Sequence, residues 1–264
     1  MHSELQAAVL GILQGLTEFL PVSSSAHLTL TPWLLGWNDP GLAFDVALHM
    51  GSLLALLIYY RNDWLSIING AIGGDRRGRR LLGLLVAASV PGAILGFLFE
   101  KQAETVFRSP LLIAGALAVL GLALWIVDVA APQVRDIDEI RLGDALLIGL
   151  AQAFALVPGV SRSGATITVG RALGINRQDA ANFSFLMSAP IIGGAGLLKA
   201  HELLHSGITG ALTVGFVMST VFSLAAIAIL IAYVRTRTYK AFAWYRFILA
   251  AFVVAIYVMR AGHM

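Results

Sequence analysis

The sequence contains no cysteine, and only 12% of its 264 residues are charged. The absence of cysteine excludes disulfide bonds, thiolate metal sites and a cysteine nucleophile. The shortage of charge argues against a soluble domain, in which about a quarter of the residues are charged. Hydrophobic residues make up 58% of the chain instead, and its mean hydropathy is +0.81. This composition predicts a polytopic membrane protein.

Six apolar stretches are long enough to cross a bilayer, which takes roughly 20 residues of helix. Four are unambiguous and two carry polar interruptions, but the interrupted ones keep the necessary length. We therefore expect six transmembrane helices, at about 43–60, 81–99, 110–130, 179–200, 209–234 and 241–259.

The basic residues account for a pI near 9.4 without any nucleic-acid partner. They gather in short loops, above all 73–80 (GGDRRGRR) and 235–240 (RTRTYK). Such clusters mark the cytoplasmic side of a membrane protein. With 73–80 in the cytoplasm, thirteen Lys and Arg residues fall on that side, Arg246 among them, four fall outside, and Arg162 belongs to neither. Both termini are then expected outside.

One pattern occurs twice in the chain. A shift of 138 positions aligns residues 11–28 (GILQGLTEFLPVSSSAHL) with residues 149–166 (GLAQAFALVPGVSRSGAT). Chance matches in a greasy sequence would pair Leu and Ala, whereas this alignment also pairs polar residues: Gln14 with Gln152, Ser23 with Ser161 and Ser25 with Ser163.

We expect one membrane domain, 1–264, built from two repeats at about 4–130 and 141–262. Three predicted spans follow each copy of the pattern. An odd number of crossings inserts the second repeat upside down, which is the inverted topology of many membrane proteins.

Each copy is broken in its middle. Pro21 in the first copy and Pro158-Gly159 in the second stop a helix, and Ser23 and Ser161 are good N-caps for a new one. We expect two re-entrant helical hairpins, one from each face, meeting near the midplane of the membrane. Irregular backbone at that depth is tolerated only beside protein or a water-filled cavity. The predicted fold is all-α, with six spans, two hairpins and a cavity between them.

Two half-helix N-termini would face this cavity, and helix N-termini bind anions such as phosphate. Arg162 adds a planar, charged fork that suits phosphate oxygens. The remaining candidates for substrate binding are an amide, Gln14, and a set of hydroxyls: Ser23, Ser24, Ser25, Ser161, Ser163 and Thr166.

Gln14 and Glu18 share one helix face, because they are four residues apart. A carboxylate beside a phosphate site repels its ligand unless a divalent cation bridges them. Glu18 therefore predicts magnesium or calcium, held jointly with substrate phosphates. Ser24 or His27 is then the candidate nucleophile, with the other or Glu18 as base.

Two further polar residues stay open at this point. Asp45 and His49 are four apart in the first predicted span. They either reach the cavity or pair only with each other. A purely structural scaffold is not favoured, because it would leave Arg162 and Glu18 inside the membrane without a purpose.

The two motifs QGLTEFLPVSSSAH and PGVSRSGAT resemble the signatures of the undecaprenyl pyrophosphate phosphatase family of the bacitracin-resistance type. The resemblance covers essentially the whole chain. It implies an enzyme of the bacterial inner membrane that removes the terminal phosphate of undecaprenyl pyrophosphate with a divalent cation. The product is the carrier lipid of peptidoglycan synthesis.

By this resemblance the catalytic residues are Glu18, His27, Ser24 and Arg162, with Arg162 as pyrophosphate clamp. Gln14 occupies a place where many members carry glutamate, so one acidic ligand is missing from that helix. Attack by Ser24, by His27 or by water directly remains open. The cavity is expected to open to the periplasmic face.

A transporter of polyprenyl phosphate lipids is the alternative, because inverted repeats with broken helices are also typical of transporters. The expected partners are the polyprenyl pyrophosphate substrate and the bilayer, with no nucleic acid. The Gly-rich segment 193–196 allows close helix packing, within one protomer or in a homodimer.

Overall fold

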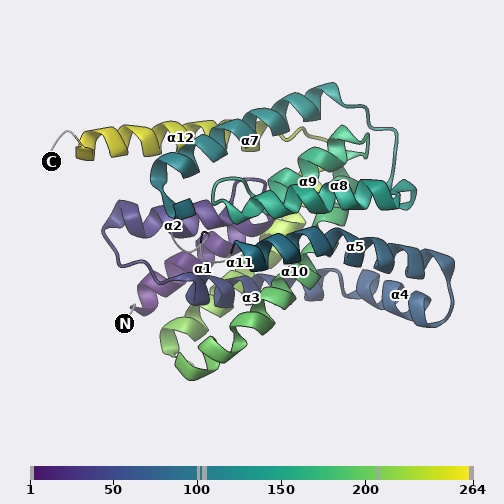
Figure 1. Ribbon diagram of the computed structural model, residues 1–264, viewed down its shortest axis with the longest axis horizontal. Coiled ribbons are helices and arrows are strands. Elements are labelled where there is room, and N and C mark those ends of the chain that lie inside the picture. The colour runs from purple at the N-terminus through teal and green to yellow at the C-terminus, as the bar shows by residue number, and fades with distance from the viewer. Residues whose placement is uncertain (1–2, 100–101, 103–105, 207–208, 262–264) are drawn as a thin grey trace.

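The computed structural model describes residues 3–99, 102, 106–206 and 209–261, without the side chains of residue 42 and residues 202–206. These described residues are mainly helical. Their one pairing of extended backbone is an isolated bridge between Arg135 and Ile175. The predicted all-α fold class is confirmed (Figure 1).

In the described part of the chain, five helices are long and apolar enough to cross a membrane, and a bent helix pair makes a sixth candidate. The protein is thus a multi-pass membrane protein, as its composition predicts. The five are α5 (Arg76–Leu98), α7 (Pro110–Ala130), α10 (Arg177–Ser206), α11 (Gly210–Val234) and α12 (Lys240–Ala261). The bent pair is α3 (Leu42–Tyr59) with α4 (Arg61–Ile72).

The basic segment 73–80 is expected to lie in a loop, but the structure places helices before and within it, α4 and α5. The chain bends by 74° between α3 and α4, and α4 buries Ile67 while Leu65 and Ile72 stay exposed. Helix α5 then begins at Arg76, because the Asp75 carboxylate caps it by accepting the Gly78 N–H at 2.9 Å. That bond holds the pKa of Asp75 below its usual value. The arginines of 73–80 therefore lie in the first turns of a helix.

Both copies of the repeated pattern are broken where the sequence predicts. In each, a first helix ends before the proline, and a second begins directly after the predicted N-cap serine. The short 3₁₀ turn η3 prolongs the first helix of the second copy. The elements are α1 (Glu4–Phe19) and α2 (Ser24–Leu35) in one copy, and α8 (Leu142–Ala153), η3 (Phe154–Leu156) and α9 (Arg162–Ala172) in the other. Their re-entrant path through a membrane stays a prediction.

The first helix of each copy packs against a span from the other half of the chain: α1 on α11, and α8 on α5. Glycines in equivalent positions make both contacts. A Cβ on Gly11 would overlap the Gly215 carbonyl oxygen, and one on Gly149 would overlap the Ala88 carbonyl oxygen. Small residues of this kind let helix backbones approach closely. Helices α7 and α12 run side by side along one edge of the bundle (Figure 1).

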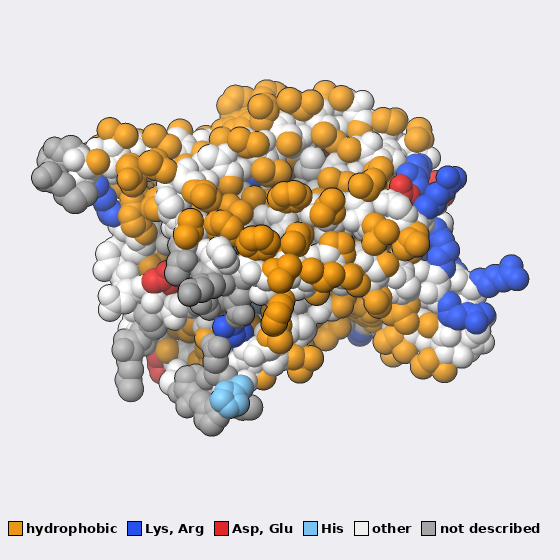
Figure 2. All heavy atoms as spheres, in the orientation of Figure 1, with side chains coloured by type: hydrophobic (Ala, Val, Ile, Leu, Met, Phe, Trp, Pro, Cys, Tyr) orange, Lys and Arg blue, Asp and Glu red, His pale blue; other side chains and the backbone are white. Residues whose placement is uncertain are grey.

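Charge and hydrophobicity are separated on the surface. Hydrophobic side chains cover most of the face in Figure 2, and most of the visible Lys and Arg side chains gather at its right end, beside α4. Ion pairs join the elements at this end: Arg77 lies 2.7 Å from Asp138, and Arg177 lies 2.7 Å from Asp128. The charge count in the sequence predicts both arginines, Arg77 and Arg177, on the cytoplasmic side of the membrane. Lys101, expected on the other side, lies outside the described residues.

Replacing Gly149 by Ala should destabilise the protein, because the added methyl group would push α8 away from α5. We expect a loss of about 1–3 kcal/mol, the usual cost of overpacking, measured by thermal denaturation in detergent. Gly115→Ala in α7 is the matched control, since nothing lies within 4 Å of its added Cβ. It should be neutral or stabilising by up to about 1 kcal/mol. Equal stability of the two variants would contradict this close contact.

Candidate active site

The two helix breaks touch each other. Ser23 and Ser161 both have positive φ, 75° and 69°, the two such non-glycine residues among those described. Each caps the helix that follows: Ser23 accepts the Ala26 N–H and Ser161 accepts the Gly164 N–H. The Ser23 hydroxyl also accepts the Gly159 N–H of the other break at 3.0 Å. The predicted meeting of the two N-termini is therefore observed, built from two turns of one design.

Arg246 of α12 holds this junction together. Its guanidinium is fully buried and donates to Pro21 O of the first break and to Gly159 O and Val160 O of the second. It also donates to Leu117 O and Ala116 O of α7. The sequence counts Arg246 with the basic residues of the cytoplasmic side, and that position stays a prediction. The structure shows that its side chain is buried and satisfies carbonyl groups that the breaks leave without helical partners.

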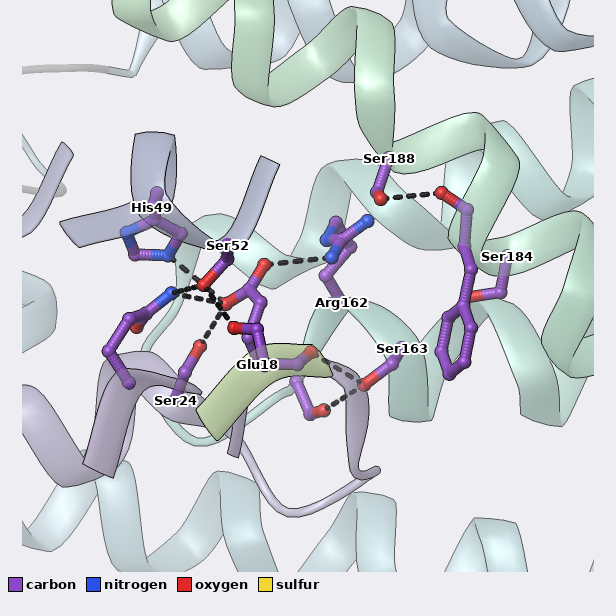
Figure 3. Close-up of polar contacts among 12 residues, drawn as sticks. Glu18, Ser24, His49, Ser52, Arg162, Ser163, Ser184 and Ser188 are labelled. Atoms are coloured by element: carbon purple, nitrogen blue, oxygen red, sulfur yellow. Dashed lines mark hydrogen bonds and ion pairs between the residues drawn. The ribbon is translucent and has the colours of Figure 1, made fainter. Parts of the chain in front are cut away.

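Four donors converge on the buried Glu18 carboxylate, near the end of α1 (Figure 3). Oε1 pairs with Arg162 Nη2 at 2.7 Å. Oε2 accepts Ser24 Oγ–H at 2.6 Å and Gln14 Nε2–H at 3.0 Å, and His49 Nε2 lies 3.3 Å away. A carboxylate buried in this way is tolerated because charged and polar donors replace its water. The structure thus joins the predicted residues Gln14, Glu18, Ser24 and Arg162.

His49, which the sequence left open, is part of this cluster. Its Nδ1 lies 2.7 Å from Asp45 O. A carbonyl oxygen only accepts hydrogen bonds, so Nδ1 carries a proton. Its Nε2 faces the Glu18 carboxylate, which accepts as well when ionised. The geometry therefore suits a doubly protonated His49 beside an ionised Glu18.

A cavity of about 250 Å³ lies beside the cluster. Its lining includes five predicted polar residues: Glu18, Ser24, Ser25, Ser161 and Arg162. It also includes apolar residues, among them Leu28, Val46, Leu156, Ile191 and Ile192. The N-termini of α2 and α9 both reach this space, and the first N–H groups of a helix lack intrahelical partners. This arrangement suits an anionic group attached to an apolar chain.

The other predicted binding residues lie behind the cavity wall. Ser163 donates to Leu20 O at 3.1 Å, which ties α9 to the first break. Thr166 forms a hydrogen bond with the Ser184 hydroxyl at 2.6 Å. The Ser23 hydroxyl already accepts the N–H groups of Ala26 and Gly159. Their hydroxyls hold the helices together, so direct contact with substrate is not what their positions favour.

His27 lies outside the cluster and the cavity lining. Its Nδ1 lies 2.7 Å from Ser23 O, and its Nε2 lies 2.6 Å from the Tyr245 hydroxyl. The residues of α2 that line the cavity are Ser24, Ser25, Leu28 and Thr29, and His27 falls on the neighbouring face of the helix, against α12. Its catalytic role stays a prediction, and this geometry does not favour it.

Sequence reasoning missed Arg108 and Gln152, which are further polar residues of the cavity lining. Arg108 pairs with Asp45 at 3.2 Å and with Asp39 at 3.0 Å, which places a second arginine in the lining. Gln152 of α8 also lines the cavity. The alignment of Gln152 with Gln14 was the one signal that pointed to it.

The donors available to a divalent cation are few. Among the described residues, no group of three or more His, Asp or Glu side chains could hold a metal ion. Glu18 offers its carboxylate, and Gln14 Oε1 is buried without a hydrogen-bond partner in the described part of the chain. Magnesium takes oxygen ligands, often one or two carboxylates completed by substrate phosphates and water. The residues fit a cation that arrives with its phosphates.

Arg246→Met should destabilise the protein by about 3 kcal/mol or more, because it leaves several buried carbonyl groups without donors at a cost of about 1–3 kcal/mol each. Arg260→Met is the matched control. Arg260 also donates to two backbone carbonyls, Trp33 O and Leu34 O, but on the exposed surface. We expect a change below about 1 kcal/mol for this control, and similar denaturation temperatures for the two variants would argue against the role of Arg246.

Comparison with known proteins places the chain in a family. Residues 7–252 match the family described as bacitracin resistance protein BacA. The undecaprenyl-diphosphatase of Moorella thermoacetica is 50% identical over 257 residues, which cover 97% of this chain and 98% of the relative. That of Pelotomaculum thermopropionicum is 49% identical, covering 95% and 96%. The resemblance of the two motifs is confirmed, and the chain belongs to the family of the bacitracin resistance protein BacA.

Proposed function

We propose that the protein hydrolyses undecaprenyl pyrophosphate to undecaprenyl phosphate and inorganic phosphate. The two relatives are named undecaprenyl-diphosphatase, after this reaction. The observation that carries the proposal here is the Ser24 hydroxyl, which donates to Glu18 at 2.6 Å while Arg162 binds the other oxygen of the same carboxylate. A hydroxyl on a carboxylate base, beside an arginine, is what phosphoryl transfer to serine requires.

The reaction is then a double displacement. Ser24 Oγ forms a bond to the terminal phosphorus, the bridging P–O bond breaks, and undecaprenyl phosphate leaves. Glu18 takes the Ser24 proton. Water next attacks the phosphoserine, inorganic phosphate leaves, and the Ser24 hydroxyl is restored. General-base assistance of this kind contributes typically about 10²–10⁴ in rate.

Positive charge around the phosphates stabilises the transition state. Arg162 and the N-termini of α2 and α9 supply it from the lining of the cavity. His49 touches the same Glu18 oxygen as Ser24. It fixes the carboxylate and balances its charge, which a base needs in an apolar interior. His27, held between Ser23 O and Tyr245, acts in this scheme by orienting α2.

A divalent cation, magnesium or calcium, would be held by Glu18, Gln14 Oε1 and the phosphates of the substrate. When bound, it neutralises phosphate charge and so allows a carboxylate to lie beside the substrate. Because Gln14 stands where a second glutamate could be, the protein's own ligands bind the cation only weakly. The cation then binds chiefly through the substrate.

The cavity is proposed to open to the outer face of the bacterial inner membrane. Its lining residues in α3, α5 and α10 belong to the halves of these helices that lie away from the basic end. The apolar residues of the lining then receive the start of the polyprenyl chain. Both termini lie outside in this orientation. A homodimer stays a prediction, and the transport alternative is not favoured, because the relatives are named as phosphatases.

Phosphate release from undecaprenyl pyrophosphate in detergent should fall at least about 100-fold in Ser24→Ala and in Glu18→Gln. The covalent intermediate identifies the nucleophile. Phosphoserine survives an acid quench, whereas phosphohistidine survives only an alkaline one. With substrate labelled in its terminal phosphate, we expect acid-stable label on the peptide that holds Ser24. The same label should appear in the His27→Ala variant. Label on His27 would overturn the assignment, and turnover without any label would indicate direct attack by water.

Chelation should abolish phosphate release, and magnesium or calcium should restore it. Gln14→Glu supplies the missing carboxylate and should lower the cation concentration needed for half the maximal rate, by about 10-fold if one charged ligand contributes about 1.4 kcal/mol. Gln178→Glu, on α10 and away from the cavity lining, is the control for added charge. Full activity in chelator would remove the cation from the mechanism.

A further inference from the structure

Gln152 is a buried amide that the proposed chemistry does not use. It lies in α8 and is 4% exposed. Neither its Nε2 nor its Oε1 has a hydrogen-bond partner within the described residues, and the residue lines the cavity beside Glu18 and Arg162. An unpaired polar group costs stability in a folded interior. Native proteins therefore seldom keep one without a reason.

The repeat shows what is unusual about this glutamine. Its counterpart, Gln14, donates from Nε2 to Glu18 at 3.0 Å and to Ser52 at 3.2 Å. In the second copy, position 156 corresponds to Glu18 and holds Leu156. The amide of Gln152 therefore sits on an equivalent helix without its carboxylate partner, and its donors are free.

The space around Gln152 is kept open by a glycine. A Cβ on Gly92 of α5 would lie 2.9 Å from Gln152 Nε2, so any larger residue there would crowd the amide. Arg162 has a second free donor in the same cavity, because its Nη1 is also buried without a partner among the described residues. Two unused N–H donors, one of them charged, face one space that can accept an anion.

We propose that Gln152 binds the pyrophosphate of the substrate, donating Nε2–H to a phosphate oxygen beside Arg162. The inference rests on the proposed function and adds a binding residue to it. An amide neither titrates nor attacks phosphorus, so Gln152 contributes to binding and not to proton transfer. Its missing partner is supplied by the ligand.

Stability separates this role from a structural one. Gln152→Leu replaces an unpaired amide by an apolar side chain of similar size, so the ligand-free protein should melt at the same temperature or about 2 °C higher. Gln14→Leu removes two buried hydrogen bonds and should melt several degrees lower. A clear fall in melting temperature for Gln152→Leu would show that its amide supports the fold, against the proposal.

Kinetics give the second readout. Loss of a hydrogen bond to a charged phosphate should raise KM for undecaprenyl pyrophosphate about 10-fold in Gln152→Leu, with a smaller change in kcat. Gln152→Glu should raise KM further, because a carboxylate repels phosphate. Gln178→Leu on α10 is the matched control and should leave KM unchanged. A KM for Gln152→Glu equal to that of the parent would contradict the proposal. A lower magnesium requirement of this variant would show instead that residue 152 binds the cation, which also overturns it.

Inorganic pyrophosphate tests binding without turnover. We expect it to raise the melting temperature of the parent protein, and to do so less for Gln152→Leu at each concentration. If the parent releases no phosphate but shows this difference, the binding site stands and the proposed hydrolysis fails. If the parent hydrolyses its substrate while Gln152→Leu keeps KM and the full pyrophosphate shift, only the role of Gln152 is overturned.

Discussion

The structure depends on satisfying two helix breaks that face each other in an apolar interior. Backbone carbonyls exposed by a break cannot turn to water there. Arg246 solves this for both breaks at once, by donating to Pro21 O on one side and to Gly159 O and Val160 O on the other. With these carbonyls occupied, the N-termini of α2 and α9 are left to face the cavity. The guanidinium has no carboxylate among these partners, so its positive charge remains close to the junction where the proposed function places the anionic substrate.

In the proposed reaction, the ion pair between Glu18 and Arg162 links substrate binding to chemistry. In the ligand-free protein Arg162 compensates the buried carboxylate. A phosphate group competes for the same guanidinium, and a carboxylate that gives up part of an ion pair accepts a proton more readily. In the proposed reaction, the phosphate therefore takes up part of the charge of Arg162, and Glu18 takes the proton of Ser24, whose hydroxyl donates to it in the ligand-free protein.

The sequence predicts those features that depend on local residue types. Proline stops the first helix of each copy and serine starts the second, so both breaks were predicted correctly. Five of the six expected spans are long apolar helices in the described part of the chain, and the first is the bent pair of α3 and α4. Features that depend on packing escape such an argument. Arg246 lies in an expected span and is counted only as one more basic residue of the cytoplasmic side, so its contacts with both breaks become visible only once α12 is packed against them. His27 belongs to the signature motif, but the rotation of α2 turns it toward Tyr245. His49 reaches Glu18 from a separate helix, which no spacing along the chain could reveal.

The two repeats share a backbone design but divide the chemistry between them. Ser23 and Ser161 adopt the same unusual conformation and the same cap. The residue after this serine is the candidate nucleophile Ser24 in one copy and the positively charged Arg162 in the other. About one helical turn before the break, Glu18 in the first copy corresponds to Leu156 in the second. Two identical copies would present two carboxylates to a pyrophosphate and repel it. One copy that carries the base and another that carries the positive charge create a site that binds the anion and reacts with it, so the asymmetry of the repeat is what the proposed reaction requires.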